Sequence, residues 1–197
     1  GAIGPNAILQ PAAVLRERCG EGRAGVLLHA ATGRGLDGLP DALVDEGEVA
    51  RLHRTIVRDL GWGEGLSLLA EAGARTGDYL LAHRIPRLAQ RLLKALPPSL
   101  ALRLLAGAMA RHAWTFAGSG RFAFRPGAPP AFEIRGCPLA RGIEAPEPAC
   151  RFYAAAFERL VGALVAPDAR VTETSCEALG DDACRFAVDS GARTGLR

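Results

Sequence analysis

The chain has almost no lysine and few aromatic residues. Arginine supplies nearly all of its 24 basic side chains, Lys94 is the only lysine, and the net charge is +3 across 197 residues. The arginines are spread along the chain and form no block that interleaves with aromatic residues, so a nucleic-acid groove is disfavoured. The sequence therefore predicts no nucleic-acid partner.

Long hydrophobic runs are also missing. No window approaches the roughly 20 consecutive apolar residues of a transmembrane helix, and the apolar stretch 100–109 is short and contains Arg103. The first residues show neither the basic start nor the apolar run of a secretory signal. We therefore expect a cytoplasmic protein with no membrane span. In such a protein, five cysteines indicate reduced thiols or metal ligands rather than a disulfide framework.

The motifs of a self-sufficient redox enzyme are absent as well. Gly33–Gly38 fits G-x-G-x-x-G, but Leu39 and Pro40 follow where a dinucleotide site has a helix N-terminus, so we interpret it as a glycine-rich loop. No Ser/His/Asp or Cys/His arrangement has a recognisable spacing. Iron–sulfur clusters usually need four thiolates, and Cys19 and Cys137 stand alone and are predicted to be small buried residues. The sequence favours binding over catalysis.

What is present indicates one globular domain. Hydrophobic content of 49% and charged content of 23% are ordinary values, so we treat 1–197 as one domain with an arm at 1–20 and a tail at 189–197. Helical spacing predicts helices over 11–18, 21–31, 48–60, 66–83, 86–96, 99–112 and 150–166. Strand patterns predict a hairpin over 115–125 and strands over 131–135, 170–178 and 183–188. The order predicts an α+β fold: N-terminal helices on one face of a C-terminal antiparallel sheet of about four strands, with one inserted helix.

One pattern near the C-terminus is typical of a metal site, and its members are Cys150, Glu173, Cys176 and Cys184. Glu173 and Cys176 lie along one stretch, Cys184 returns opposite them after a turn, and Cys150 begins the preceding helix. Thiolates with one carboxylate suit zinc, which prefers tetrahedral S, N and O donors. On spacing alone, a disulfide between Cys176 and Cys184 and a set of reduced buried thiols remain alternatives.

The order of elements, ending in E-T-S-C-E-A-L-G-D-D-A-C-R-F at 173–186, resembles the 4-vinyl reductase domain family. The resemblance covers most of the chain. That family shares its fold with transport-particle subunits and with the sensory domains of phenol-responsive activators, which bind zinc through Cys, Glu, Cys and Cys. Glu173, Cys176 and Cys184 match that motif, and Cys150 sits at the upstream position. The resemblance implies a structural Zn²⁺ site with every ligand from the protein.

The opening segment Ile3–Ile8 further resembles stand-alone members of the family that are encoded with bacteriochlorophyll biosynthesis in purple bacteria. This resemblance implies a Mg-tetrapyrrole ligand, such as Mg-protoporphyrin or protochlorophyllide, and pathway enzymes as partners. We interpret the protein as a carrier or delivery factor. Two alternatives stay open: a divinyl (proto)chlorophyllide vinyl reductase that needs an external donor, and a ligand sensor or scaffold subunit.

Five side chains are candidates for holding such a ligand: Tyr79, His83, His112, Trp114 and Phe116. In the related sensory domains the ligand pocket lies between the helices and the sheet. His112, one turn beyond Met109, is expected to face inward and to ligate magnesium or donate a hydrogen bond. Trp114 and Phe116 follow closely. For each candidate a plain core or solvated position is the alternative.

Gly73 and Gly77 lie four residues apart on the long predicted helix. That spacing lets another helix approach closely. Together with the habit of the family, it predicts a homodimer.

Overall fold

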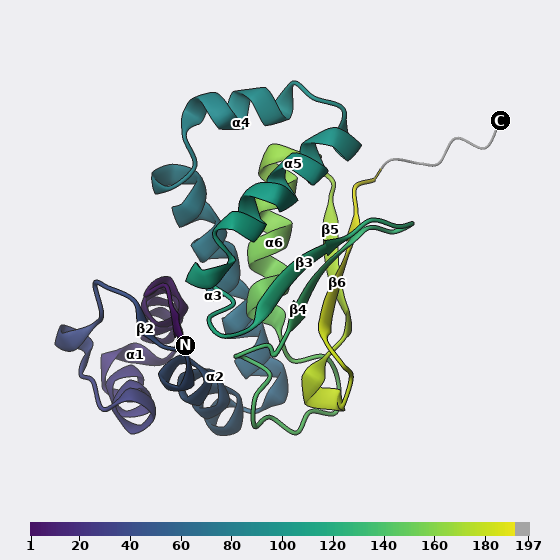
Figure 1. Cartoon of the computed structure of the whole chain (residues 1–197). Coiled ribbons are helices and arrows are strands. Elements are labelled where there is room, and N and C mark those ends of the chain that lie inside the picture. Colours follow the sequence, from purple (N-terminus) through teal and green to yellow (C-terminus); the bar gives the residue numbers. More distant parts are fainter. Residues whose placement is uncertain (192–197) are drawn as a thin grey trace.

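The computed structural model describes residues 1–191, so residues 192–197 of the predicted tail lie outside the described residues. Helices dominate the first part of the chain and the main sheet ends it (Figure 1). The helices are α1 (Asn6–Thr32), α2 (Glu46–Leu60), α3 (Trp62–His83), α4 (Arg87–Lys94), α5 (Pro98–Arg111) and α6 (Arg151–Leu164). The strands are β1 (Ala2–Ile3), β2 (Val44–Asp45), β3 (Arg121–Arg125), β4 (Ala131–Arg135), β5 (Arg170–Ser175) and β6 (Cys184–Asp189).

The main sheet has four antiparallel strands in the order β3-β4-β6-β5, and α6 is inserted between β4 and β5. β1 and β2 pair separately near the N-terminus. Alternate residues of β5 and β6, such as Val171 and Phe186, are buried on the face that meets the helices. The predicted α+β fold with a helix inserted in the sheet is confirmed. Among the described residues no helix is long and apolar enough to cross a membrane.

Glu133 stabilises the outer face of this sheet. Its carboxylate, at the centre of β4, accepts hydrogen bonds from Arg125 at 2.7 Å, Arg135 at 2.9 Å and Arg185 at 2.8 Å. Of these interactions, the bond from Arg125 contributes most to lowering the pKa of Glu133 to about 2. A buried carboxylate is thereby balanced by cations from three strands.

The first helix begins earlier than its periodicity predicts. We expected two short helices with Pro11 at the first helical position, whereas α1 starts at Asn6 and is interrupted at Gly20, whose φ of 79° is left-handed. Proline has no N–H, so Pro11 leaves the carbonyl of Ala7 without its helical donor. The buried His53 of α2 lies 3.2 Å from that oxygen through Nε2. A side chain from another helix thus completes the first turns of α1, which sequence periodicity does not reveal.

The predicted hairpin around residues 118–120 is wrong. β3 begins only at Arg121, and the hairpin turn lies at 126–130, between β3 and β4. The glycine-rich turn is instead fixed to α2, because the backbone N–H and the hydroxyl of Ser119 donate to Glu46 at 2.7 and 2.6 Å. Gly118 supplies the positive φ of 57° that this turn requires.

Gly73 and Gly77 allow close packing within the chain. A Cβ on Gly73 would lie 2.1 Å from the carbonyl oxygen of Phe152, and one on Gly77 would lie 2.7 Å from Cβ of Arg159. Both contacts are with α6, which crosses α3 behind the sheet (Figure 1). The close helix approach predicted from these glycines is therefore an intramolecular one, and it gives no structural support to a homodimer.

Aromatic side chains fill the space between the helices and the sheet. The rings of Phe132 and Phe157 are 5.2 Å apart, and the hydroxyl of Tyr153 donates to the carbonyl of Phe116 at 2.6 Å. The members of this aromatic cluster are Phe116, Phe122, Phe132, Tyr153, Phe157 and Phe186. It belongs to one continuous core that reaches from Ile3 to Val188.

Candidate metal centre

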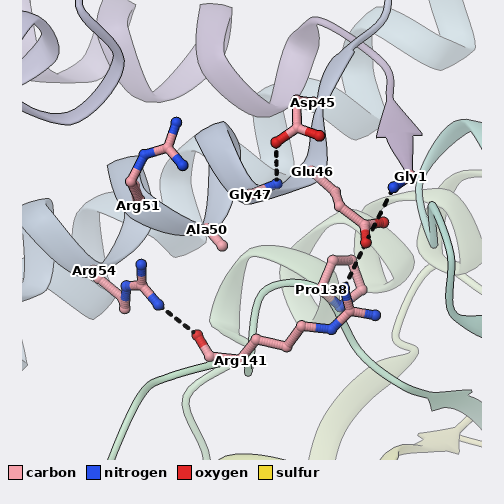
Figure 2. A pocket seen from close by; sticks show the side chains of 9 residues that line it. All are labelled: Gly1, Asp45, Glu46, Gly47, Ala50, Arg51, Arg54, Pro138 and Arg141. Carbon is pink, nitrogen blue, oxygen red and sulfur yellow. Dashed lines mark hydrogen bonds and ion pairs between the residues drawn. The ribbon is translucent and has the colours of Figure 1, made fainter.

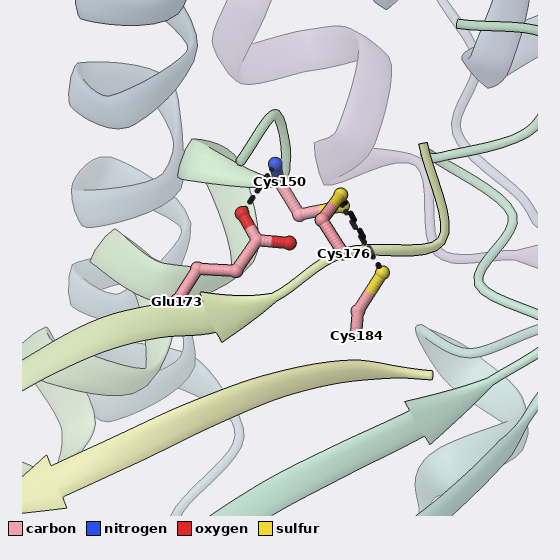
Figure 3. Close-up of side chains that lie close together, drawn as sticks. All are labelled: Cys150, Glu173, Cys176 and Cys184. Atoms are coloured by element: carbon pink, nitrogen blue, oxygen red, sulfur yellow. Dashed lines mark hydrogen bonds between the residues drawn. The ribbon is translucent and has the colours of Figure 1, made fainter. Parts of the chain in front are cut away.

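The four residues predicted to bind metal converge at one end of the sheet (Figure 3). Cys150 precedes the first residue of α6, Glu173 lies on β5, Cys176 follows the end of β5, and Cys184 opens β6. All four are buried, and one ligand atom from each lies within 4.8 Å of every other. A turn and a helix start therefore bring together residues that are up to one helix apart in sequence.

The three sulfur atoms have the separations of a zinc ligand set. Sγ of Cys150 is 3.7 Å from that of Cys184 and 4.0 Å from that of Cys176, and Cys176 and Cys184 are 3.9 Å apart. A tetrahedral ion with Zn–S bonds of about 2.3 Å requires sulfur–sulfur distances of about 3.8 Å. All five cysteines are free thiols, so the alternative of a Cys176–Cys184 disulfide is not what the structure contains.

Glu173 supplies the oxygen of the set. Its Oε2 accepts the backbone N–H of Cys150 at 2.7 Å, whereas Oε1 is buried and has no hydrogen-bond partner among the described residues. Burial, followed by the proximity of Cys176, raises the pKa of Glu173 to about 8. An unpaired buried carboxylate oxygen is costly, and a cation bound between Oε1 and the thiols would remove that cost.

The turn between β5 and β6 is held by bonds to its own side chains. The backbone N–H of Cys176 donates to Asp181 at 2.7 Å, and that of Glu177 donates to Sγ of Cys184 at 3.4 Å. Gly180 closes the turn with a φ of 89°. Hydrogen bonds of this kind orient ligands before any metal binds.

The electrostatics of the cluster favour a bound cation over empty thiolates. Neighbouring thiols, that of Cys137 first, and then burial raise the pKa of Cys150 well above its ordinary value. Several buried negative charges are not stable together without a cation. Since the four ligand atoms are all buried, the arrangement suits a closed structural site rather than a catalytic one with an open position.

Cys137 was not included in the predicted set, yet it lies beside it. The prediction that it is buried is confirmed, but it does not stand alone, because its Sγ is 3.7 Å from that of Cys150. The pairing of Ile134 with Cys184 explains this, since the chain leaving β4 passes the start of β6. That register is not readable from the sequence. Cys19, predicted to be buried, is only partly so.

The five predicted ligand-binding residues do not meet in one site. Tyr79 and His83 form a pair with ring centroids 4.7 Å apart near the end of α3. His112 is exposed, so its predicted inward orientation is wrong. α5 ends at Arg111, and the chain turns before His112 can continue the buried stripe that includes Met109.

The two aromatic residues that follow separate from each other. Trp114 is 57% exposed, whereas Phe116 packs in the aromatic cluster. The interior candidate and the surface candidates therefore occupy different environments, and the structure does not bring them to one point.

A charged cavity of about 290 Å³ lies between α2 and the loop that carries Arg141 (Figure 2). Arg141 donates to Glu46, and Arg54 donates to the carbonyl of Arg141 at 2.9 Å. Burial opposes the ionisation of Glu46, but its bonds to Ser119 and Arg141 bring its pKa down to about 2. These groups cross-link the helices to the loop before α6. The lining lacks the apolar walls of a pocket for a large hydrophobic ligand.

Two solved structures illustrate the fold. An H-NOX protein from K. algicida in its Fe(II) unliganded state aligns with a TM-score of 0.61 at 10% identity, covering 98% of each chain. The phenol-responsive sensory domain of the activator PoxR, solved with phenol, aligns with a TM-score of 0.53 at 17% identity, covering 83% of this chain and 88% of that one. At these identities the likeness shows a shared fold.

Sequence comparison is more specific. Residues 130–190, which contain Cys137 and all four residues of the metal set, match the model of the 4-vinyl reductase domain. A bacteriochlorophyll synthase 23 kDa chain from Cereibacter sphaeroides is 50% identical over 186 residues, covering 94% of this chain and 89% of the relative. Another protein of that name, from Rhodobacter capsulatus, is 39% identical over 201 residues, covering 98% and 90%. The predicted resemblance is thereby confirmed, and the chain belongs to the family of the bacteriochlorophyll synthase 23 kDa chains.

Proposed function

We propose that this protein is a zinc-stabilised binding protein that holds Mg-tetrapyrrole intermediates of bacteriochlorophyll biosynthesis and delivers them to pathway enzymes in the cytoplasm. The names of its relatives support the pathway. The observation that carries the binding role is the closed, fully buried ligand set, which leaves no position for a substrate at the metal.

In this proposal Cys150, Glu173, Cys176 and Cys184 hold the ion. Bound zinc supplies positive charge that keeps the three thiolates and the carboxylate ionised. The four residues then tie the β5–β6 turn to the start of α6. The proposed role is structural: the site keeps the sheet and α6 in register behind the aromatic cluster.

The proposed ligand space is the aromatic cluster under α5. α4 has no buried residue, so moving it exposes little core, and elements with few buried contacts open at low free energy. Phe116 and Phe122 lie behind α5 and would line the opened space. His112 and Trp114 stand where α5 leads into this cluster, which places them at its rim in the proposal.

Titration with Mg-protoporphyrin and with protochlorophyllide tests the proposal. We expect saturation near one pigment per chain, with a shifted Soret band and quenched emission from Trp114. Trp62→Phe isolates that signal, and Phe116→Ala should change the affinity. With a nicotinamide donor present, an unchanged vinyl group supports a carrier, whereas its reduction supports the vinyl reductase alternative. No saturable binding contradicts the proposal.

A subunit role is a second candidate, because the relatives are named as one chain of a synthase. In that case the protein would bind a pathway enzyme without holding pigment. Co-purification with such an enzyme from pigment-free extract, combined with no pigment titration, would favour it. Light scattering of the purified protein tests the predicted homodimer in the same samples.

A further inference from the structure

Cys137 lies at ligand distance from the proposed metal set. It is fully buried, and its Sγ is 3.7 Å from that of Cys150, the same separation as between Cys150 and Cys184. That value is close to the roughly 3.8 Å between two thiolates on one tetrahedral zinc ion. Five ligand-capable side chains therefore surround a centre that takes four.

The loop that carries Cys137 is fixed to the same turn that carries the other thiols. The carboxylate of Glu177, between Cys176 and Cys184, accepts the backbone N–H of Gly136 at 2.6 Å and that of Cys137 at 2.7 Å. This clamp holds Cys137 beside the cluster independently of any metal.

We propose that Cys137 and Glu173 are alternative fourth ligands of one metal ion, whose existence rests on the proposed function. The other three positions belong to Cys150, Cys176 and Cys184. Both sets carry the same ligand charge, three thiolates plus either a carboxylate or a fourth thiolate. When Cys137 binds, the proton from its thiol passes to the carboxylate of Glu173, so charge and protons balance. The all-sulfur form suits softer metal ions.

X-ray absorption of the zinc-loaded protein tests this exchange, with zinc content measured in parallel. We expect Glu173→Gln to retain one zinc with four sulfur neighbours, and Cys137→Ser to retain one with three sulfurs and one oxygen. The double variant should bind zinc at least about a hundredfold more weakly. Cys19→Ser, outside the cluster, is the matched control.

The inference is overturned if Glu173→Gln loses zinc as completely as Cys176→Ser does. It is also overturned if Cys137→Ser leaves the coordination of the Glu173→Gln protein unchanged. A wild-type protein that binds no zinc overturns the proposed metal site as well, and the two failures are therefore distinguishable.

A separate observation concerns the α4–α5 segment and the residues around it. From Tyr79 to Phe132 the chain contains no aspartate or glutamate. It contains eight cations in that stretch: Arg84, Arg87, Arg91, Lys94, Arg103, Arg111, Arg121 and Arg125. Because the whole chain has a net charge of only +3, the remainder is net acidic. The arginines are spread along the chain, but the acidic residues are not.

The same segment exposes its largest apolar side chains. Leu88 and Leu92 on α4, and Leu100 and Leu104 on α5, recur four residues apart and are exposed. Trp114 is exposed just beyond the end of α5. Both helices lie at the end of the molecule away from α1 and α2 (Figure 1). Leucine stripes flanked by cations are typical of helices that lie in a membrane interface.

We infer that this face docks on the surface of a bilayer that contains anionic lipid. The cations attract the lipid headgroups, and the leucines enter the boundary with the acyl chains. A nucleic acid would leave the leucines in water. A second copy of this chain, packed through the same face, would place like charges opposite each other.

Flotation with vesicles tests the inference. We expect binding to phosphatidylglycerol–phosphatidylcholine vesicles, little binding to pure phosphatidylcholine, and a fall of about tenfold or more at high salt. Trp114 emission should shift to the blue in a Trp62→Phe background. Leu88→Ser should weaken binding about tenfold. Val26→Ser is the matched control, because Val26 is 68% exposed on α1 and Leu88 is 69% exposed.

Equal binding to neutral and anionic vesicles would overturn the inference, as would equal loss in Leu88→Ser and Val26→Ser. Binding of an RNA oligonucleotide without binding of anionic vesicles would also overturn it and would identify the face as a phosphate-binding one.

Discussion

The cysteine cluster at the β5–β6 turn and the α4–α5 segment satisfy their side chains in opposite ways. In the cluster, every ligand atom is buried and one carboxylate oxygen has no protein partner among the described residues. On α4 no side chain is buried, and its leucines face solvent. The first region needs a small cation to complete it, and the second needs a large apolar and anionic surface. One side of the molecule is built for internal order and the other for contact.

The largest difference should appear on removing a metal ligand. Cys176→Ser should lose the ion and cost several kcal/mol of unfolding free energy, because metal affinity is coupled to folding. Zinc content and chemical denaturation measure both effects. Cys19→Ser, at a partly exposed thiol on α1, should leave both unchanged. A zinc-free Cys176→Ser protein of wild-type stability would contradict the structural role.

The same substitution in the two regions gives the next contrast. Leu164→Ala, at a fully buried position of α6, should cost about 2 to 5 kcal/mol. Leu92→Ala, at an exposed position of α4, should stay within about 0.5 kcal/mol. Urea denaturation of the two variants compares them directly. Similar losses would mean that α4 is packed in solution and that the contrast is false.

Two helical glycines extend the contrast to the backbone. Gly73→Ala should destabilise by about 3 kcal/mol or more, since its Cβ would collide with the carbonyl of Phe152. Gly107→Ala on α5 meets no atom closer than 4.0 Å and should stabilise by about 0.5 to 1 kcal/mol. Thermal melts measure the opposite signs. A tolerated Gly73→Ala would contradict the close packing of α3 on α6.

The smallest expected effect is a dependence on pH. Burial lowers the pKa of His53 to about 4, with the carbonyl of Ala7 opposing the shift. Since its unfolded pKa is about 6.5, the neutral form stabilises the fold above that value, and this stability is lost as pH falls toward 4. Between pH 7 and pH 5 the loss should be about 2 kcal/mol.

His53→Gln keeps a donor for Ala7 and does not titrate. Denaturation at the two pH values should therefore show a smaller difference in this variant than in wild type. His112→Gln, at an exposed position beyond α5, should not reduce it. If His53→Gln keeps the full wild-type loss, then His53 is not the group responsible.

The features that were predictable from sequence are those set by short spacing. A turn between Cys176 and Cys184 brings their sulfurs together, and the alternation in residues 131–135 defines β4 at its observed bounds. The position of Cys137 depends on β4 lying beside β6 in the sheet, which no local pattern encodes.

Long-range contacts account for the other errors. Ser119 belongs to a turn fixed by Glu46, 73 residues earlier, so its glycine-rich surroundings looked like a hairpin. The early start of α1 is supported by His53, 46 residues later. The orientation of His112 depends on where α5 ends rather than on its periodicity.

The most direct test of the metal centre is zinc analysis with X-ray absorption on the protein purified without added metal. The account predicts about one zinc ion per chain, tetrahedral, with at least three sulfur neighbours near 2.3 Å. A folded protein with no bound metal, and with Cys150, Cys176 and Cys184 all free to react as thiols after unfolding, would contradict it.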